Sequence, residues 1–103
     1  MQSTLSPQQL KEELAHANTV LVDVRTPAEF SRGSLPGSIN IPLDVLPAQY
    51  TTTLPDTSAR IVVFCLSGAR SAQALTFLEQ AGFQHVSHLA GGLLAWRNME
   101  KNA

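Results

Sequence analysis

The chain has a single cysteine, few histidines and no long apolar run. Cys65 cannot form an internal disulfide, and one cysteine with three histidines does not suit a four-ligand structural zinc site. The longest uninterrupted apolar run, residues 61–66, falls far short of the roughly 20 residues that a membrane-spanning helix needs. We therefore expect no metal site, no cofactor and no association with a membrane.

Charge of either sign is also scarce. Charged residues make up 15% of the chain and the formal net charge is -1, so there is no basic excess to attract nucleic acid or an anionic bilayer. Small-molecule substrates fit this balance better. Hydrophobic residues make up 44% of the 103 residues, which predicts one folded domain spanning residues 1–103. We expect a monomer.

The first four residues, Met1-Gln2-Ser3-Thr4, lack the basic and apolar regions of a secretory signal. This absence predicts a cytoplasmic protein. A secreted protein from which a leader had been removed would show the same pattern.

Short β-branched runs alternate with helical patterns along the chain. Ser6-Pro7 and Thr26-Pro27 each have the signature of a capped helix start. The pattern predicts strands at residues 20–24, 61–65 and 86–89, and a very short strand at 39–41. Predicted helices begin after residues 6, 26, 68 and 92. Residues 43–58 are predicted to form a weak helix or an irregular connection. This alternation predicts a parallel sheet covered on both faces, with ligands bound beyond the carboxyl ends of its strands.

The segment from Cys65 to Ser71 carries the most chemical information. It leads from the end of a predicted buried strand into a predicted helix, where free backbone N–H groups and the helix dipole stabilise a thiolate. Gly68 permits the backbone angles at which consecutive amides turn inward, and Arg70 offers a planar guanidinium beside the same pocket. Because the thiolate is the reactive form of cysteine, this segment predicts a nucleophilic Cys65 in an anion-binding loop.

These residues also have simpler interpretations. A lone cysteine that ends an apolar strand is often part of the core. Arg70 could be a solvated arginine at a helix start. We interpret Ser71 as a helix cap rather than a second nucleophile, because no histidine lies near it in the sequence to act as its base.

Four segments resemble, in order, the signatures of the single-domain rhodaneses, also called thiosulfate sulfurtransferase-like domains. They are Asp23-Val24-Arg25 with Glu29-Phe30, Pro36-Gly37-Ser38-Ile39-Asn40-Ile41-Pro42, Cys65-Leu66-Ser67-Gly68-Ala69-Arg70-Ser71, and Gly91-Gly92 followed by Trp96. The resemblance extends over essentially the whole chain. It implies an α/β, three-layer fold with a five-stranded, mainly parallel sheet and helices on both faces.

The resemblance also implies an activity, that of a thiosulfate sulfurtransferase. Cys65 would be the catalytic nucleophile, taking the outer sulfur of a donor such as thiosulfate, releasing sulfite, and passing the sulfur from a persulfide to cyanide, a thiol or a protein cysteine. The implied substrate-binding residues are those of the loop: Leu66, Ser67, Gly68, Ala69, Arg70 and Ser71. Their backbone N–H groups would hold the persulfide, and the Arg70 side chain would orient the sulfonate of the donor.

The loop bears on the choice of donor and on two rival functions. Ala69 and Arg70 differ from the loops of relatives that use mercaptopyruvate, which favours thiosulfate or a persulfide.

Phosphatases and arsenate reductases also place an arginine after a cysteine, but with a longer loop than the four residues between Cys65 and Arg70. A persulfide carrier without turnover, or a module that docks onto a partner, is the second rival. The nucleophile argues against a docking module but not against a carrier.

Other polar and aromatic residues are assigned structural roles. We interpret Asp23 and Arg25 as a structural charged pair at a strand end, with Asp23 anchoring a loop. His85 and His88 should point to opposite faces of a short strand and lie at the surface. Trp96 is predicted to pack the closing helix onto the sheet.

Overall fold

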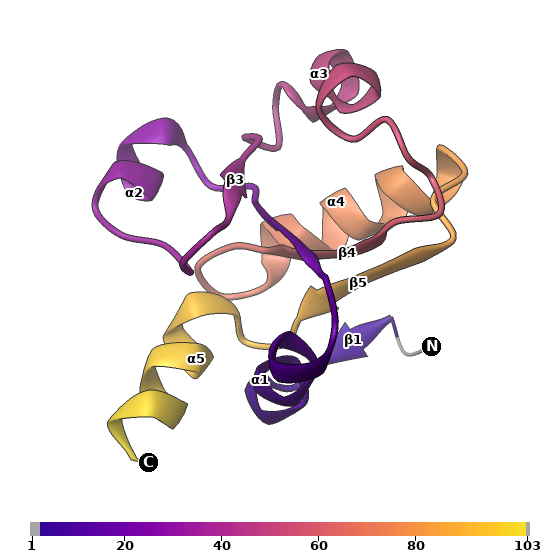
Figure 1. Ribbon diagram of the computed structural model, residues 1–103. Helices are drawn as coiled ribbons and strands as arrows, with labels where there is room; N and C mark the ends of the chain where they lie inside the picture. Colours follow the sequence, from indigo (N-terminus) through magenta and orange to yellow (C-terminus); the bar gives the residue numbers. More distant parts are fainter. Residues whose placement is uncertain (1–2, 103) are drawn as a thin grey trace.

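The computed structural model describes residues 3–102, which form a five-stranded sheet with helices on both faces (Figure 1). The strands are β1 (Thr4–Leu5), β2 (Val20–Asp23), β3 (Ile39–Asn40), β4 (Arg60–Phe64) and β5 (His85–Leu89). The helices are α1 (Pro7–His16), α2 (Pro27–Ser31), α3 (Leu46–Thr53), α4 (Ala69–Gln80) and α5 (Gly92–Lys101). The sheet order is β1-β5-β4-β2-β3 and all pairs are parallel, which confirms the predicted fold class.

Two separate apolar cores hold the helices to the sheet. On one face, Val22, Val63 and Val86 pack with the α3 residue Leu46 and the α4 residue Leu78. On the other face, side chains of α1 and α5 pack on the sheet; this second core contains Leu5, Leu10, Leu21, Leu35, Val62, Phe64, Leu89 and Leu93. Trp96 packs against the second core, as predicted. Figure 1 shows α3 at the top of the molecule and α1 and α5 at the bottom.

The central strands bring two chemically important segments together. β2 pairs with β4 so that Asp23 lies opposite Phe64, and the N–H of Val24 donates to the Phe64 carbonyl over 2.9 Å. Both strands therefore end at the same edge of the sheet. Arg25 follows one of them and Cys65 follows the other, so the two predicted signatures become neighbours.

Both predicted helix starts are confirmed in atomic detail. The Ser6 hydroxyl accepts from the N–H of Gln9, and the Gln9 side chain accepts in return from the N–H of Ser6. Thr26 and Glu29 make the same reciprocal pair at the start of α2. Each pair satisfies two backbone donors that a helix leaves open at its first turn.

Three local features differ from the expectation or extend it. The two-residue strand β1 lies at the sheet edge beside β5 and was not predicted from the pattern. The uncertain segment 43–58 contains a regular helix, α3, in spite of Pro47. None of the helices in residues 3–102 is both long enough and apolar enough to cross a bilayer. The cytoplasmic location stays a prediction.

Candidate active site

Cys65 lies in the loop between β4 and α4, and its side chain is only 1% exposed. The N–H of Gly68 donates to Sγ over 3.1 Å, and the N–H of Ser71 donates over 3.3 Å. The Ser71 hydroxyl lies 3.6 Å from the same sulfur. Two backbone N–H donors thus converge on one sulfur atom, which is the arrangement that an anion at this position requires.

The loop has this shape because its carbonyls are held on the far side by α5. The N–H groups of Leu93 and Leu94 donate to the carbonyls of Cys65 and Leu66 over 2.9 and 3.0 Å. Gly92 makes that approach possible, since a Cβ there would stand 2.5 Å from both carbonyl oxygens. Gly68, at φ +114°, completes the inward turn in a conformation that favours glycine.

The same contacts set the ionisation of Cys65. Burial raises the pKa of a thiol because a buried charge loses its hydration. Here the Ser71 hydroxyl and the backbone N–H groups of Ser71, Gly68 and Ser67 outweigh burial and hold the pKa of Cys65 below its ordinary value. The loop can therefore present a thiolate, the form in which cysteine acts as a nucleophile.

Arg70 makes a bidentate ion pair with Glu29 of α2. Nη1 lies 2.7 Å from Oε1 and Nη2 lies 3.0 Å from Oε2. This pairing, with the Thr26 cap, lowers the pKa of Glu29 to about 2, so the carboxylate is charged at neutral pH. Glu29 raises the pKa of Arg70, and attraction to Cys65 adds to this effect. The Arg70 guanidinium therefore holds the loop to α2. The sequence pattern does not predict Glu29 as the partner of Arg70.

Asp23 and Arg25 form the buried frame beneath the loop, the structural role predicted for them. Asp23 is fully buried and Arg25 is 4% exposed. Arg25 Nη2 lies 2.8 Å from Asp23 Oδ2 and donates to the Gly33 carbonyl over 2.7 Å. The Ser34 hydroxyl donates to Asp23 Oδ2 over 2.8 Å. These bonds fix the segment that follows α2 against the end of β2.

The prediction that Ser71 is a helix cap is wrong, and so is the prediction that His88 lies at the surface. Gly68, not Ser71, is the N-cap of α4. Ser71 lies inside the first turn, where its hydroxyl is 3.1 Å from the Gly68 carbonyl and 3.0 Å from Nδ1 of His88. His88 is half-buried rather than a surface residue, although His85 is exposed as predicted. The two residues are remote in sequence but adjacent in space, because β5 lies beside β4 under α4.

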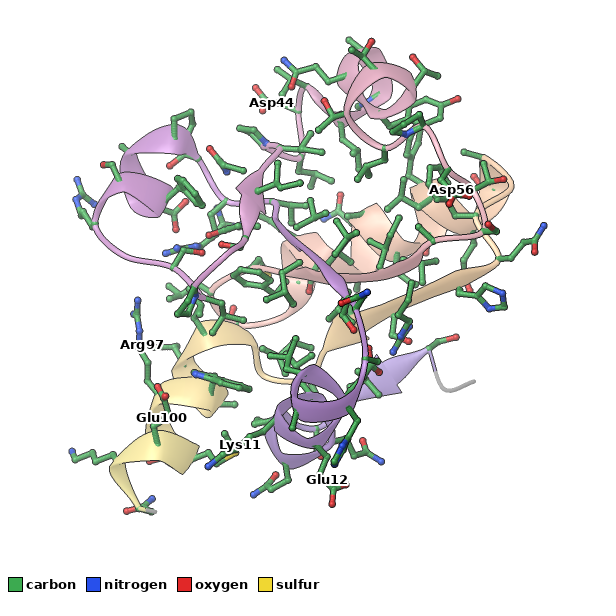
Figure 2. The ribbon with its side chains drawn as sticks, in the orientation of Figure 1. Lys11, Glu12, Asp44, Asp56, Arg97 and Glu100 are labelled. Carbon is green, nitrogen blue, oxygen red and sulfur yellow. The ribbon has the colours of Figure 1, made fainter. Side chains whose placement is uncertain are left out.

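The remaining loop residues differ in how far their side chains are exposed. Leu66 is half-buried and packs against the second core, while Ser67 and Ala69 are exposed. A hollow of about 230 Å³ opens beside Leu66 and is lined also by Arg25, Glu29, Arg32, Gly33 and Arg97. Figure 2 shows the Arg97 side chain on α5 extending toward the segment that follows α2. The lining carries more positive than negative side chains.

Other parts of the described chain offer less chemistry. A groove of about 820 Å³ lies between α1 and α5 and contains none of the predicted site residues. Within residues 3–102, no group of three or more His, Cys, Asp or Glu side chains is placed to hold a metal ion. The loop around Cys65 is therefore the candidate active site.

Comparisons with known proteins agree with this geometry. A family model described as a rhodanese-like domain matches residues 6–99. A sulfurtransferase of Allochromatium vinosum is 37% identical over 97 residues, covering 93% of this chain and 89% of that protein. Thiosulfate sulfurtransferase PspE of Escherichia coli is 38% identical over 72 residues, covering 70% of this chain and 68% of PspE. The crystal structure of a rhodanese-related protein from Thermoplasma volcanium matches with a TM-score of 0.84 at 30% identity, covering 95% of this chain and 93% of that one. Two longer curated relatives are matched over only 51% and 24% of their length.

Proposed function

The chain belongs to the rhodanese-like domain family, and from that membership we propose that it moves sulfane sulfur from thiosulfate or a persulfide donor to a thiophilic acceptor through a persulfide on Cys65. A sulfurtransferase-type function is supported by the sulfurtransferases among its relatives. The observation that carries the finer proposal is the pair of backbone N–H groups, from Gly68 and Ser71, that donate to Cys65 Sγ.

The first half-reaction loads the enzyme. The Cys65 thiolate attacks the outer sulfur of thiosulfate and forms a new S–S bond, while the bond between that sulfur and the sulfonate breaks. Sulfite leaves with the electron pair of the broken bond, and the negative charge stays on the outer sulfur of the persulfide. The N–H groups of the loop stabilise this charge, because preformed donors act on it without having to reorganise.

The second half-reaction returns the enzyme to its starting state. A nucleophilic acceptor such as cyanide or a thiolate attacks the outer sulfur of the persulfide, and the Cys65 thiolate leaves. A thiolate of lowered pKa is a good leaving group in this step. The same loop thus favours both loading and discharge of sulfur.

In this proposal Arg70 binds the sulfonate of the donor, although its ion pair with Glu29 occupies some of its N–H groups. A guanidinium carries five N–H donors, and Glu29 takes one from each terminal nitrogen. Donors therefore remain for the sulfonate of thiosulfate. The positive lining of the hollow beside Leu66 supports an anionic donor as well.

Intact mass spectrometry tests the proposal. After incubation with thiosulfate, the protein should gain the mass of one sulfur atom, cyanide should remove it quickly, and Cys65→Ser should gain nothing. His85→Asn, an exposed change on β5 outside the loop, is the matched control and should load normally. A stable persulfide that cyanide does not remove would instead indicate a carrier. Failure of the wild-type protein to gain sulfur from thiosulfate or a persulfide would contradict the proposal.

A further inference from the structure

His88 is joined to the reactive sulfur by a single intervening side chain. Its Nδ1 lies 3.0 Å from Ser71 Oγ, which in turn lies 3.6 Å from Cys65 Sγ. We call these three side chains the Cys65–Ser71–His88 chain. Ser71 is fully buried and His88 is half-buried, so water competes little for these contacts. The proposed sulfur transfer, as described so far, leaves His88 without a role.

The Ser71 hydroxyl has one hydrogen and three neighbours that can accept it. They are the Gly68 carbonyl at 3.1 Å, His88 Nδ1 and Cys65 Sγ. When Nδ1 carries no hydrogen, it competes with the sulfur for the hydroxyl hydrogen. When Nδ1 carries a hydrogen, it donates to Ser71 Oγ instead, and the hydroxyl hydrogen is available to a thiolate. The protonation state of His88 therefore decides how well Ser71 stabilises the thiolate.

Within residues 3–102, no other charged group competes for the imidazole among the elements packed on β5. β1 carries no titratable side chain. β4 carries Arg60, which pairs with Glu13 and lies in register with His85 rather than with His88. α4 carries Arg70, which is paired with Glu29, and Glu79, which lies more than two turns beyond Ser71. On its own strand, His85 is exposed and sits on the opposite face.

We propose that His88 is a positioning residue for the Cys65 nucleophile, and that its imidazole accepts, through the Ser71 hydroxyl, the proton that the thiol loses. The S–H bond of Cys65 breaks and its electron pair stays on sulfur. The proton passes to Ser71 Oγ while the hydroxyl proton of Ser71 passes to Nδ1. The products are a thiolate, an unchanged serine and an imidazolium, so atoms and charge balance. The proposal rests on Cys65 being the nucleophile of the proposed function.

Burial favours the neutral form of the His88 imidazole, which is the form that has a free acceptor nitrogen. Burial lowers its pKa, which keeps the ring neutral at neutral pH while Cys65 is a thiol, and Nδ1 is the acceptor in the tautomer that carries its hydrogen on Nε2. Once the thiolate forms, its negative charge favours the imidazolium, because opposite charges attract more strongly in a partly buried site. The two groups therefore titrate as a coupled pair.

The pH dependence of alkylation by iodoacetamide tests this proposal directly, because Cys65 is the sole thiol in the sequence. His88→Leu should shift the midpoint of the rate profile upward by about one pH unit, a tenfold smaller thiolate fraction below the midpoint. His88→Asn can place an N–H donor near the position of Nδ1, so it should recover part of the shift. His85→Asn, on the same strand but exposed, is the matched control and should keep the wild-type midpoint.

The route through Ser71 is tested by a double-mutant cycle. Ser71→Ala should raise the midpoint by itself, and adding His88→Leu should then change little, because the link is already cut. An unshifted midpoint in His88→Leu that unfolds at the wild-type temperature would overturn the proposal, and so would a full His88→Leu effect in the Ser71→Ala background.

If His88→Leu does not fold, the imidazole itself can be titrated by NMR. The pKa of His88 should be lower in Cys65→Ser than in the thiolate form of the wild-type protein, and equal values would overturn the proposal. Loading of the wild-type protein with sulfur from thiosulfate is a separate readout. Loading together with an unshifted His88→Leu midpoint would mean that the proposed function stands while the role of His88 fails.

Discussion

We propose that the Arg70 side chain serves both the fold and the binding of the sulfur donor. Its ion pair with Glu29 holds the loop to α2, and a charge on Cys65 helps to raise the pKa of Arg70. A purely structural arginine and one that also binds the donor differ in one respect. Only the second discriminates between an anionic donor and a neutral one.

Arg70→Ala should therefore raise the KM for thiosulfate about tenfold, the equivalent of one hydrogen bond to a charged group. It should harm transfer from a neutral persulfide donor much less. Steady-state kinetics with the two donors gives the comparison. Lys11→Ala, which removes a positive charge on α1 and outside the loop (Figure 2), is the control and should change neither KM. Equal losses with both donors would count against a role in donor binding.

Gly92 is the residue on which the close approach of α5 to the loop depends. It has φ +61°, and a Cβ there would collide with the Cys65 and Leu66 carbonyls. Gly92→Ala should cost about 3 kcal/mol of unfolding free energy and should also slow sulfur loading, because the loop must shift. Urea denaturation and the loading assay measure the two effects.

Gly37 provides a matched control for Gly92, since its φ is +79° and nothing lies within 4 Å of its missing Cβ. Gly37→Ala should cost only about 1 kcal/mol, the penalty of the left-handed backbone alone. It should load sulfur at the wild-type rate. Equal losses of stability in the two variants would mean that the contact of Gly92 with the loop is unimportant.

At the scale of residues, the sequence predicts contacts between near neighbours in the chain but not contacts between distant residues. The inward N–H groups on Cys65 follow from a short loop with a glycine in it, so a local pattern predicted them. The contact between Ser71 and His88 joins residues 17 positions apart on two elements. No local pattern carries that information, so the pattern alone predicts a helix cap at Ser71.

At the scale of elements, the Glu29–Arg70 ion pair ties α2 to the start of α4. Both partners are partly exposed, at 24% and 35%, so solvent screens the pair and its contribution is about 1 kcal/mol. The folded pKa of Glu29, about 2, lies below its ordinary value of 4.5. The stabilisation is therefore full above pH 4.5 and is lost as the pH falls through about 2.

Glu29→Gln should accordingly be less stable than the wild-type protein at neutral pH, and the difference should vanish near pH 2. Thermal unfolding of the two proteins across this range measures it. Glu12→Gln, an exposed change on α1 (Figure 2), is the control. A difference that stays constant down to pH 2 would contradict the assignment of the stabilisation to a charged Glu29.

The elements themselves were predictable to different degrees. β2 and β4 are β-branched, apolar and bounded by polar residues, so their pattern was sufficient. β1 has two residues and exists because β5 offers it an edge, with the N–H of His88 bonded to the Ser3 carbonyl. Such a strand has no pattern of its own. Helix α3 starts at Leu46, and Pro47 lies in its first turn. A backbone N–H in the first turn has no partner within the helix, so proline is tolerated there.

At the scale of the whole molecule, we predict a monomer from the distribution of apolar side chains. The radius of gyration is 12.5 Å, close to the value of about 13 Å expected for a single domain of this length. Within residues 3–102, Ile39 and Leu94 are the large hydrophobic residues classed as exposed, and they lie on different elements. Isolated exposed residues do not make an oligomer interface.

Light scattering coupled to size-exclusion chromatography should therefore give the 11.1 kDa of one chain, independent of protein concentration. Leu94→Lys should give the same mass and the same elution volume as the wild-type protein. A larger mass that Leu94→Lys reduces would contradict the monomer and identify α5 as the contact.

The account as a whole depends on the loop holding sulfur as an anion. The ultraviolet absorbance of the thiolate, followed through a pH titration of the wild-type protein with Cys65→Ser as the blank, measures that property without any substrate. The loop donors predict a midpoint below the value of about 8.5 for a free cysteine. A midpoint at or above that value would contradict the account, because the backbone donors would then not outweigh burial.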